Sequence, residues 1–194
     1  MQLRRDRHHV DVKSRTVLLF AVVVSSLAAC GSGGSSGPAK LALGTRAEVA
    51  YTAPASGDNA AVDTRIAVTV LAVRKGTQSE LVEGGFTIDD DIKDSTPYYV
   101  DVRYENVGTG EALTDQSVLM EDTKNNTVSG TIVLNFGGEP FSHCVAVETK
   151  PLPAGQSYEE CTLFLVPKGK KIDRVRFVSQ GPDAKITFTD WSIS

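Results

Sequence analysis

The chain has 194 residues, with 20 Lys and Arg against 24 Asp and Glu, and a formal net charge of −4. This length allows a single domain. An acidic chain repels nucleic-acid phosphates and anionic lipid head groups, so its charge argues against nucleic-acid binding and against electrostatic docking to a membrane.

Residues 1–29 predict a signal peptide. Basic residues between Arg4 and Arg15 precede an uncharged run, residues 16–29, that is rich in Val and Leu. A charged region followed by an apolar one is typical of secretory signals. The run is shorter than the ~20 residues of a membrane-spanning helix, so we expect cleavage, after export by the general secretory route rather than the twin-arginine route.

The tetrapeptide Leu27-Ala28-Ala29-Cys30 resembles the bacterial lipobox, which implies that diacylglycerol is attached to Cys30 before cleavage. Residues 31–37 are all Gly or Ser, a composition typical of a flexible spacer. We therefore expect a lipidated cysteine and spacer over residues 30–44, and a domain over residues 45–194 held at the extracytoplasmic face of the cell membrane. The alternative is an ordinary secretory cleavage site followed by a chance cysteine.

Cleavage would remove five of the basic and two of the acidic residues, leaving a net charge of about −7. Two further cysteines remain, Cys144 and Cys161. Because exported proteins mature in an oxidising compartment, we expect these two to form a disulfide.

Apolar and polar residues alternate along the mature chain with the period of two that is typical of strands. A short strand is expected near residues 46–52, and a central one over residues 64–75. In the latter, one face carries Ile66, Val68 and Val70 and the other carries Thr69, Leu71 and Val73.

Residues 97–106 predict a half-solvated strand. Its inward face is expected to carry Tyr98, Val100, Val102 and Tyr104, and its outward face Asp101, Arg103 and Glu105. Tyr98 and Tyr104 are interpreted as core residues, with an aromatic binding surface as the alternative. Tyr99, on the opposite face, is expected to be exposed.

Shorter strands are expected at residues 118–121 and 132–136, with a turn near Lys124 between them. Residues 141–149 and 157–167 predict a hairpin centred near residue 153, which would make Cys144 and Cys161 cross-strand neighbours. Residues 172–178 and 185–194 predict the last two strands, with Trp191 in the core.

These elements predict an all-β fold, because helical spacing is nearly absent. Seven to nine strands with turn signals about every ten residues favour a two-sheet antiparallel sandwich. The alternative is an up-and-down barrel.

Three segments resemble an immunoglobulin-like domain of Gram-positive, particularly actinobacterial, lipoproteins, similar to a secreted mycobacterial immunogenic antigen. The segments read YYVDVRYENVGTGEAL, PLPAGQSYEECTLFLVPKG and IDRVRFVSQG. The resemblance spans roughly residues 60–190 and includes an Asn-x-Gly turn at Asn106 and a strand closing on Val166-Pro167. It implies an immunoglobulin-like sandwich and a membrane-bound location, and it supplies no catalytic residues.

His143 is the single histidine of the mature chain. A zinc or copper site would therefore need Cys144 and Cys161 as well, which a disulfide would prevent. A hydrolase triad is not expected, because no Gly-x-Ser-x-Gly elbow follows a strand.

Asp89, Asp90, Asp91 and Asp94 are candidate calcium ligands, since they concentrate the carboxylate oxygens that calcium prefers. Their spacing is not that of an EF-hand loop, and a solvated loop is the alternative interpretation.

Arg174 and Arg176 alternate on one strand, and we expect cross-strand ion pairs with Asp101 or Glu105. The alternative is that they bind an anionic ligand.

We expect a non-enzymatic surface lipoprotein that acts as an interaction module of the cell envelope, with no cofactor. Its partners would be the membrane, through the lipid, and an envelope protein, a polymer or a small ligand. The alternative is a carrier or sensor that binds a ligand or a metal such as calcium between the sheets. An enzyme would require paired carboxylates in a cleft, such as Asp89 and Glu83.

Overall fold

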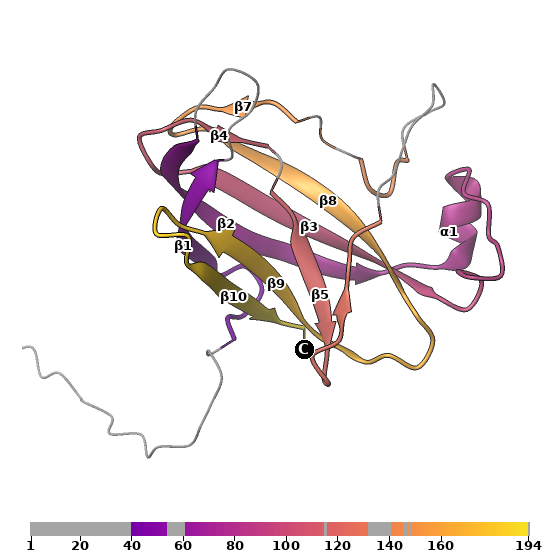
Figure 1. Cartoon of the computed structure of the whole chain (residues 1–194). Coiled ribbons are helices and arrows are strands. Elements are labelled where there is room, and N and C mark those ends of the chain that lie inside the picture. The colour runs from indigo at the N-terminus through magenta and orange to yellow at the C-terminus, as the bar shows by residue number, and fades with distance from the viewer. Residues whose placement is uncertain are drawn as a thin grey trace, which may run out of the picture. The chain divides into compact units, whose positions relative to one another are not determined.

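Ten strands and one short helix make up the described part of the computed structural model, which covers residues 40–53, 61–114, 116–131, 141–145, 147 and 149–193 (Figure 1). All of it lies within one compact unit, residues 36–194. The elements in chain order are β1 (Arg46–Ala53), β2 (Val62–Lys75), α1 (Gln78–Glu83), β3 (Thr96–Asn106), β4 (Ala112–Leu113), β5 (Val118–Asp122), β6 (Thr127–Val128), β7 (Pro151–Leu152), β8 (Ser157–Val166), β9 (Ile172–Gln180) and β10 (Ile186–Ser192).

The strands form two four-stranded antiparallel sheets, in the orders β1-β2-β3-β8 and β10-β9-β5-β6, and a small third sheet of β4 and β7. The two large sheets bury their apolar faces in one shared core, which confirms the predicted all-β antiparallel sandwich. Core side chains from the first sheet include Ile66, Val68, Val100, Val102 and Phe164, and those from the second include Met120, Val175, Phe177 and Trp191.

β2 is central, as predicted, because it pairs with β1 on one side and β3 on the other. Its register with β3 shifts between Val70 and Ala72. This bulge changes which residues face inward, so Val73 pairs with core-facing Val100 and packs on the core. The sequence-based expectation that Val73 lies on the face opposite Val70 is therefore wrong.

The predicted turn after β3 is confirmed and is built around buried Asn106. The Asn106 side chain donates to the carbonyls of Gly110 at 2.7 Å and Leu152 at 2.8 Å, and its Oδ1 accepts from Gly108 N at 3.1 Å. A Cβ on Gly108 would lie 2.2 Å from Thr64 Oγ1, so the turn requires glycine there. One side chain thus joins the turn after β3 to β7 at this end of the sandwich.

α1 was not predicted from the sequence, although its start carries a capping box. Glu80 N donates to Thr77 Oγ1, and Thr77 N donates to Glu80 Oε2 at 2.9 Å. In the described part of the chain, no helix has the length and apolar character needed to span a bilayer.

The chain enters the domain at β10. Leu41 bridges Trp191 in parallel, with Leu41 N donating to Asp190 O and Ser192 N donating to Leu41 O, both at 2.8 Å. Trp191 is fully buried, as predicted, and its Nε1 donates to Thr45 O at 2.8 Å. The predicted strand at residues 132–136 lies outside the described residues. The turn near Lys124 is confirmed, and the strand that follows it is β6.

Candidate functional site

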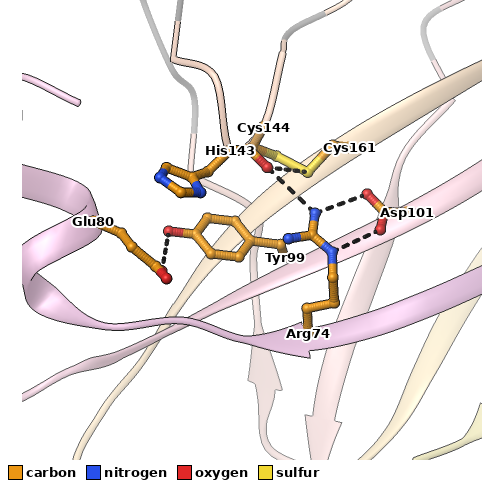
Figure 2. The surroundings of a disulfide bond; sticks show 7 residues. All are labelled: Arg74, Glu80, Tyr99, Asp101, His143, Cys144 and Cys161. Atoms are coloured by element: carbon orange, nitrogen blue, oxygen red, sulfur yellow. Dashed lines mark hydrogen bonds and ion pairs between the residues drawn. A yellow bond between two sulfur atoms is a disulfide. The ribbon is translucent and has the colours of Figure 1, made fainter. Parts of the chain in front are cut away.

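The predicted disulfide between Cys144 and Cys161 is present, with the two α-carbons 5.1 Å apart (Figure 2). The hairpin that led to it is wrong. β8 pairs with β3 along its whole length, Cys161 lies opposite Asp101, and the described residues near Cys144 form no strand. The disulfide therefore fastens a connecting segment to the outer face of the first sheet.

A second, smaller apolar cluster lies between this segment, α1 and the sheet. It contains Leu81, Tyr99, Phe141, Cys144 and Leu163. Tyr99 is 1% exposed, so the expectation of an exposed tyrosine is wrong: the helix and the segment anchored by the disulfide cover that face.

Arg74 connects the strands to the disulfide segment, as Figure 2 shows. Its guanidinium donates to both carboxylate oxygens of Asp101, at 3.0 and 3.2 Å, and to His143 O at 3.3 Å. The hydrogen bond with Asp101 raises the pKa of Arg74. Tyr99 donates to Glu80 Oε2 at 3.2 Å, and burial, followed by the charge of Glu80, raises the pKa of Tyr99 to about 12. These contacts hold the segment in place.

His143 stacks on Tyr99, with ring centroids 6.1 Å apart. The disulfide occupies both thiols that a zinc or copper site with His143 would need. Within the described ranges, no group of three or more His, Cys, Asp or Glu side chains is arranged to hold a metal ion.

Three of the four aspartates in the acidic loop make side-chain contacts, and these contacts are with different partners. Asp89 Oδ1 accepts from the backbone of Asp91 and Ile92, Asp90 pairs with Lys93 at 2.9 Å, and Asp94 lies 3.7 Å from Lys168. These residues form a hydrogen-bonded surface turn. The four candidate calcium ligands are not brought together in it as a metal-binding group.

Arg174 and Arg176 pair with Glu121 and Asp190, so the expected pairing with Asp101 or Glu105 is wrong. Each arginine contacts both acids, and the four side chains form a closed ring of ion pairs on the outer face of the second sheet. The contacts are Arg174–Glu121 at 2.5 Å, Arg174–Asp190 at 3.4 Å, Arg176–Glu121 at 2.7 Å and Arg176–Asp190 at 2.7 Å. The register explains the error: β9 lies between β5 and β10, while β3 belongs to the other sheet.

A cleft of about 390 Å³ lies between β8 of the first sheet and β5 of the second, with the residues after β6 and the disulfide forming the rest of its wall. Thr131 N donates to Leu163 O at 2.7 Å and joins the segment after β6 to β8 beside the cleft. The residues lining the cleft are Ser117, Val118, Leu119, Ser129, Gly130, Thr131, Cys144, Val147, Glu160, Cys161, Thr162 and Leu163.

The strand register turns Glu160 toward the space between the sheets. Glu160 lies opposite Val102, which is buried in the core, while its neighbours Glu159 and Cys161 face outward. The inward row of β8 is Tyr158, Glu160, Thr162, Phe164 and Val166. Its half nearest Ser157 is therefore polar, whereas Phe164 and Val166 at the other end belong to the apolar core.

Tyr104 is buried beside this polar half. It lies opposite Tyr158, and the two rings stack at 5.1 Å. Its hydroxyl has no hydrogen-bond partner among the described residues. Burial raises the pKa of Tyr104 well above its usual value, and the charges of Tyr158 and Glu160 add to that effect. The interior here contains a carboxylate and a phenol next to a cleft.

No protein-family model matches the sequence, and no curated protein does. A weak structural likeness exists. The solved structure of YcdA, a candidate lipoprotein of Bacillus subtilis, aligns over 66% of this chain at 17% identity, with a TM-score of 0.46. The aligned region is 36% of that protein, so this chain spans about a third of its length. The likeness assigns neither family nor function.

Glu160 was not singled out from the sequence, although its position carries a signal. In the run Tyr158 to Val166, the inward-facing alternation places an acid among aromatic and aliphatic residues. Cys30, the candidate lipidation site, lies outside the described residues.

Proposed function

We propose that the protein is a non-enzymatic, lipid-anchored binding module of the extracytoplasmic membrane face, and that it holds a small ligand in the cleft at β8. The observation that carries the proposal is this cleft, which opens where the inner face of β8 becomes polar. Its volume is in the range of small-molecule sites, and its wall mixes aliphatic side chains with a few polar groups, as such sites do.

Two features support the location. The lipobox-like Leu27-Ala28-Ala29-Cys30 and the Gly/Ser run after it would tether the domain at a membrane. The Cys144–Cys161 disulfide suits an oxidising compartment outside the cytoplasm. The lipobox-like sequence and the disulfide geometry both agree with export.

We infer further that the sandwich is of the immunoglobulin-like kind found in actinobacterial lipoproteins. The Asn106 turn and the turn before β8, where Gln156 N donates to Pro153 O at 3.1 Å, support this assignment. Such a scaffold fixes no activity, so the function must follow from the site.

The proposal contains no catalytic step. Glu160 is the one titratable side chain among the described residues that line the cleft, whereas acid and base catalysis by paired carboxylates needs two. The pair considered from sequence, Asp89 and Glu83, is exposed on the surface. Binding is therefore the function that the cleft supports best.

Docking of an envelope protein is a second candidate. Val178 and Phe188 are cross-strand partners on the outer face of β9 and β10, and both are exposed, as is nearby Ile186. Exposed apolar side chains that lie together are typical of interaction surfaces.

Anchoring is tested by expressing the full chain in a Gram-positive host fed a clickable palmitate analogue. We expect label on the wild-type protein and none on Cys30→Ala. Equal labelling of both, or a Cys30→Ala protein that remains in the membrane fraction, would contradict the anchor.

Ligand binding is tested by NMR on ¹⁵N-labelled residues 30–194 carrying Cys30→Ser, because residues 36–194 form a separate compact unit. The probe is 1-hexanol, a small neutral amphiphile. We expect saturable shifts at the amides of Ser129, Gly130 and Leu163. Shifts confined to Val178 and Phe188 would favour the docking surface instead.

A further inference from the structure

We infer that the exposed side chains of Val178, Ile186 and Phe188, termed the β9–β10 patch, rest on the bilayer to which the chain is tethered. This inference rests on the proposed lipid anchor and adds a second, non-covalent contact with the same membrane. The bilayer thereby takes the place of an envelope protein as the occupant of this surface. The inference is carried by the position of the patch beside the point where the tether enters the domain.

The β9–β10 patch is one apolar surface on the outer face of the second sheet. Phe188 lies directly opposite Val178, and Ile186 stands two positions before Phe188 on β10, so all three side chains share a face. Val178 is 38% exposed, Ile186 57% and Phe188 51%. Single exposed apolar residues are common on protein surfaces, whereas a group of them is typical of a surface that another partner covers.

The tether enters the domain next to this patch. Leu41 bridges Trp191, and Leu41 N donates to Asp190 O, two positions along β10 from Phe188. The bridge is parallel, so at Leu41 the chain runs in the direction that leads away from Phe188. Leu41 follows Cys30 by eleven positions, which span at most about 40 Å. A lipid on Cys30 therefore keeps the patch within reach of the bilayer.

The charges beside the patch do not oppose this contact. Glu121 and Asp190 are each paired with Arg174 and Arg176, so the acids of this face are compensated within the ring. The Arg176 guanidinium lies 4.8 Å from the centroid of the Phe188 ring. The acidic excess of the mature chain lies outside this ring. Contact through the patch therefore brings no uncompensated acid of the ring against the lipid head groups.

The contact is expected in the tethered protein and not in the free domain. Three partly exposed side chains bury little apolar area, and even a myristoyl chain by itself binds membranes marginally. The lipid on Cys30 would supply the affinity, and the tether would hold the patch at a high effective concentration near the surface. The lipid thus sets the distance of the domain from the membrane, and the patch sets which face points toward it.

The test couples ¹⁵N-labelled residues 30–194 to phosphatidylcholine nanodiscs through a maleimide lipid. Cys30 is the thiol that reacts, because Cys144 and Cys161 are joined in the disulfide. Phosphatidylcholine carries no net charge, so the contact is measured without electrostatic attraction. A gadolinium-bearing lipid in the same nanodiscs broadens the resonances of amides that lie close to the bilayer.

We expect the amides of Ile186 and Phe188 to be broadened at least threefold more than those of Arg103 and Glu159, which lie on the outer face of the first sheet. Added salt should leave this preference unchanged, because the contact is apolar. Uncoupled Cys30→Ser protein, mixed with the same nanodiscs, should show no broadening at either face.

The double variant Ile186→Ser with Phe188→Ser should remove the preference, so that the Val178 amide is broadened no more than that of Arg103. The matched control is Val82→Ser, which removes a side chain that is 58% exposed on α1 and should keep the wild-type pattern. The wild-type broadening decides the question by itself if the double variant does not fold.

Equal broadening of the two outer faces in the wild-type protein would overturn the bilayer in favour of an envelope protein, and would leave the lipid anchor standing, because the coupling here is chemical. A preference that survives the double variant would assign the orientation to the tether and overturn the role of the patch. Shifts at Val178 and Phe188 that grow with protein concentration in the absence of lipid would assign the patch to a second copy of the chain. Absence of the palmitate label on Cys30 in cells would overturn both the anchor and this inference.

Discussion

Buried or partly buried carboxylates occur in two parts of this fold, called here the two settings, and the side chains around them differ. On the outer face of the second sheet, the side chains of Glu121 and Asp190 are 6% and 4% exposed, and two arginines contact each of them. On the inner face of the first sheet, Glu160 borders a cleft whose described lining adds no basic side chain. Burial of an acid is therefore not by itself a sign of function, because Glu121 and Asp190 are buried as members of a structural ion-pair ring.

The outer ring of Glu121, Arg174, Asp190 and Arg176 joins three strands, because Glu121 lies on β5, the arginines on β9 and Asp190 on β10. The hydrogen bond with Asp190 raises the pKa of Arg176. The Arg176 guanidinium also lies over the aromatic ring of Phe188, 4.8 Å from its centroid. The ion-pair ring is therefore in contact with an exposed apolar side chain of β10.

The largest expected effect is that of opening this ring. Glu121→Gln would leave Arg176 with Asp190, and Arg174 with Asp190 and Asp173. Loss of one partner from a buried ion pair costs about 3 to 5 kcal/mol. We expect a loss of that order in the free energy of unfolding, measured with urea. The control is Glu159→Gln, which removes an exposed partner of Arg103 and should cost less than about 1 kcal/mol. Similar losses in both variants would mean that the two settings do not differ in energy.

The next largest effect is expected from the disulfide, which forms part of the cleft wall. Its sequence separation is 17, and closing a loop of this size stabilises by roughly 3 kcal/mol in the chain-entropy model. We expect Cys144→Ala with Cys161→Ala to lower the free energy of unfolding by about that amount and to shift the amides of Gly130 and Leu163.

The same double variant tests whether the cleft and the ion-pair ring are independent of each other. The side-chain Nε resonances of Arg174 and Arg176 should stay unchanged, because the ring of charges is built from β5, β9 and β10. Movement of these resonances together with the cleft amides would show that the two settings are coupled.

The smallest effect concerns Tyr99, which lies between Glu80 and the disulfide segment. Its pKa in the folded protein, about 12, lies above the ~10 of an unfolded chain. The unfolded chain therefore ionises first as the pH rises, and the contribution of neutral Tyr99 is complete below pH ~10 and lost as the pH approaches 12. We expect the urea midpoint to fall between pH 9 and pH 11, and to fall less in Tyr99→Phe. An equal fall in both proteins would assign the effect to other groups.

Much of the fold was predictable from alternation along each strand. The inward faces of Val100 and Val102, the central place of β2 and the burial of Trp191 all follow from local patterns. The disulfide was predictable for another reason: once Cys30 is set aside, two cysteines have a single possible pairing.

The errors at Arg174, Arg176 and Tyr99 share one cause, which is that their contacts are made with segments far away in the sequence. The partners of Arg174 and Arg176 depend on β9 lying next to β5 and β10, and no local pattern specifies that order. The burial of Tyr99 depends on α1 and on a segment more than 40 residues further along the chain. Glu160 was predictable in part, because its position in the inward row follows from alternation, but the cleft beside it depends on how the second sheet lies against β8.

The bridge between Leu41 and Trp191 has a mechanical consequence. If the protein is tethered through Cys30, any pull toward the membrane enters the domain at Leu41, whose two backbone hydrogen bonds attach it to β10. Beyond them the load passes along β1, which is paired with β2 at eight successive positions and would have to slide as a whole. Such a pull would load the eight paired positions of β1 together and not one hydrogen bond at a time, so the tether would join the domain at a strand held along its whole length.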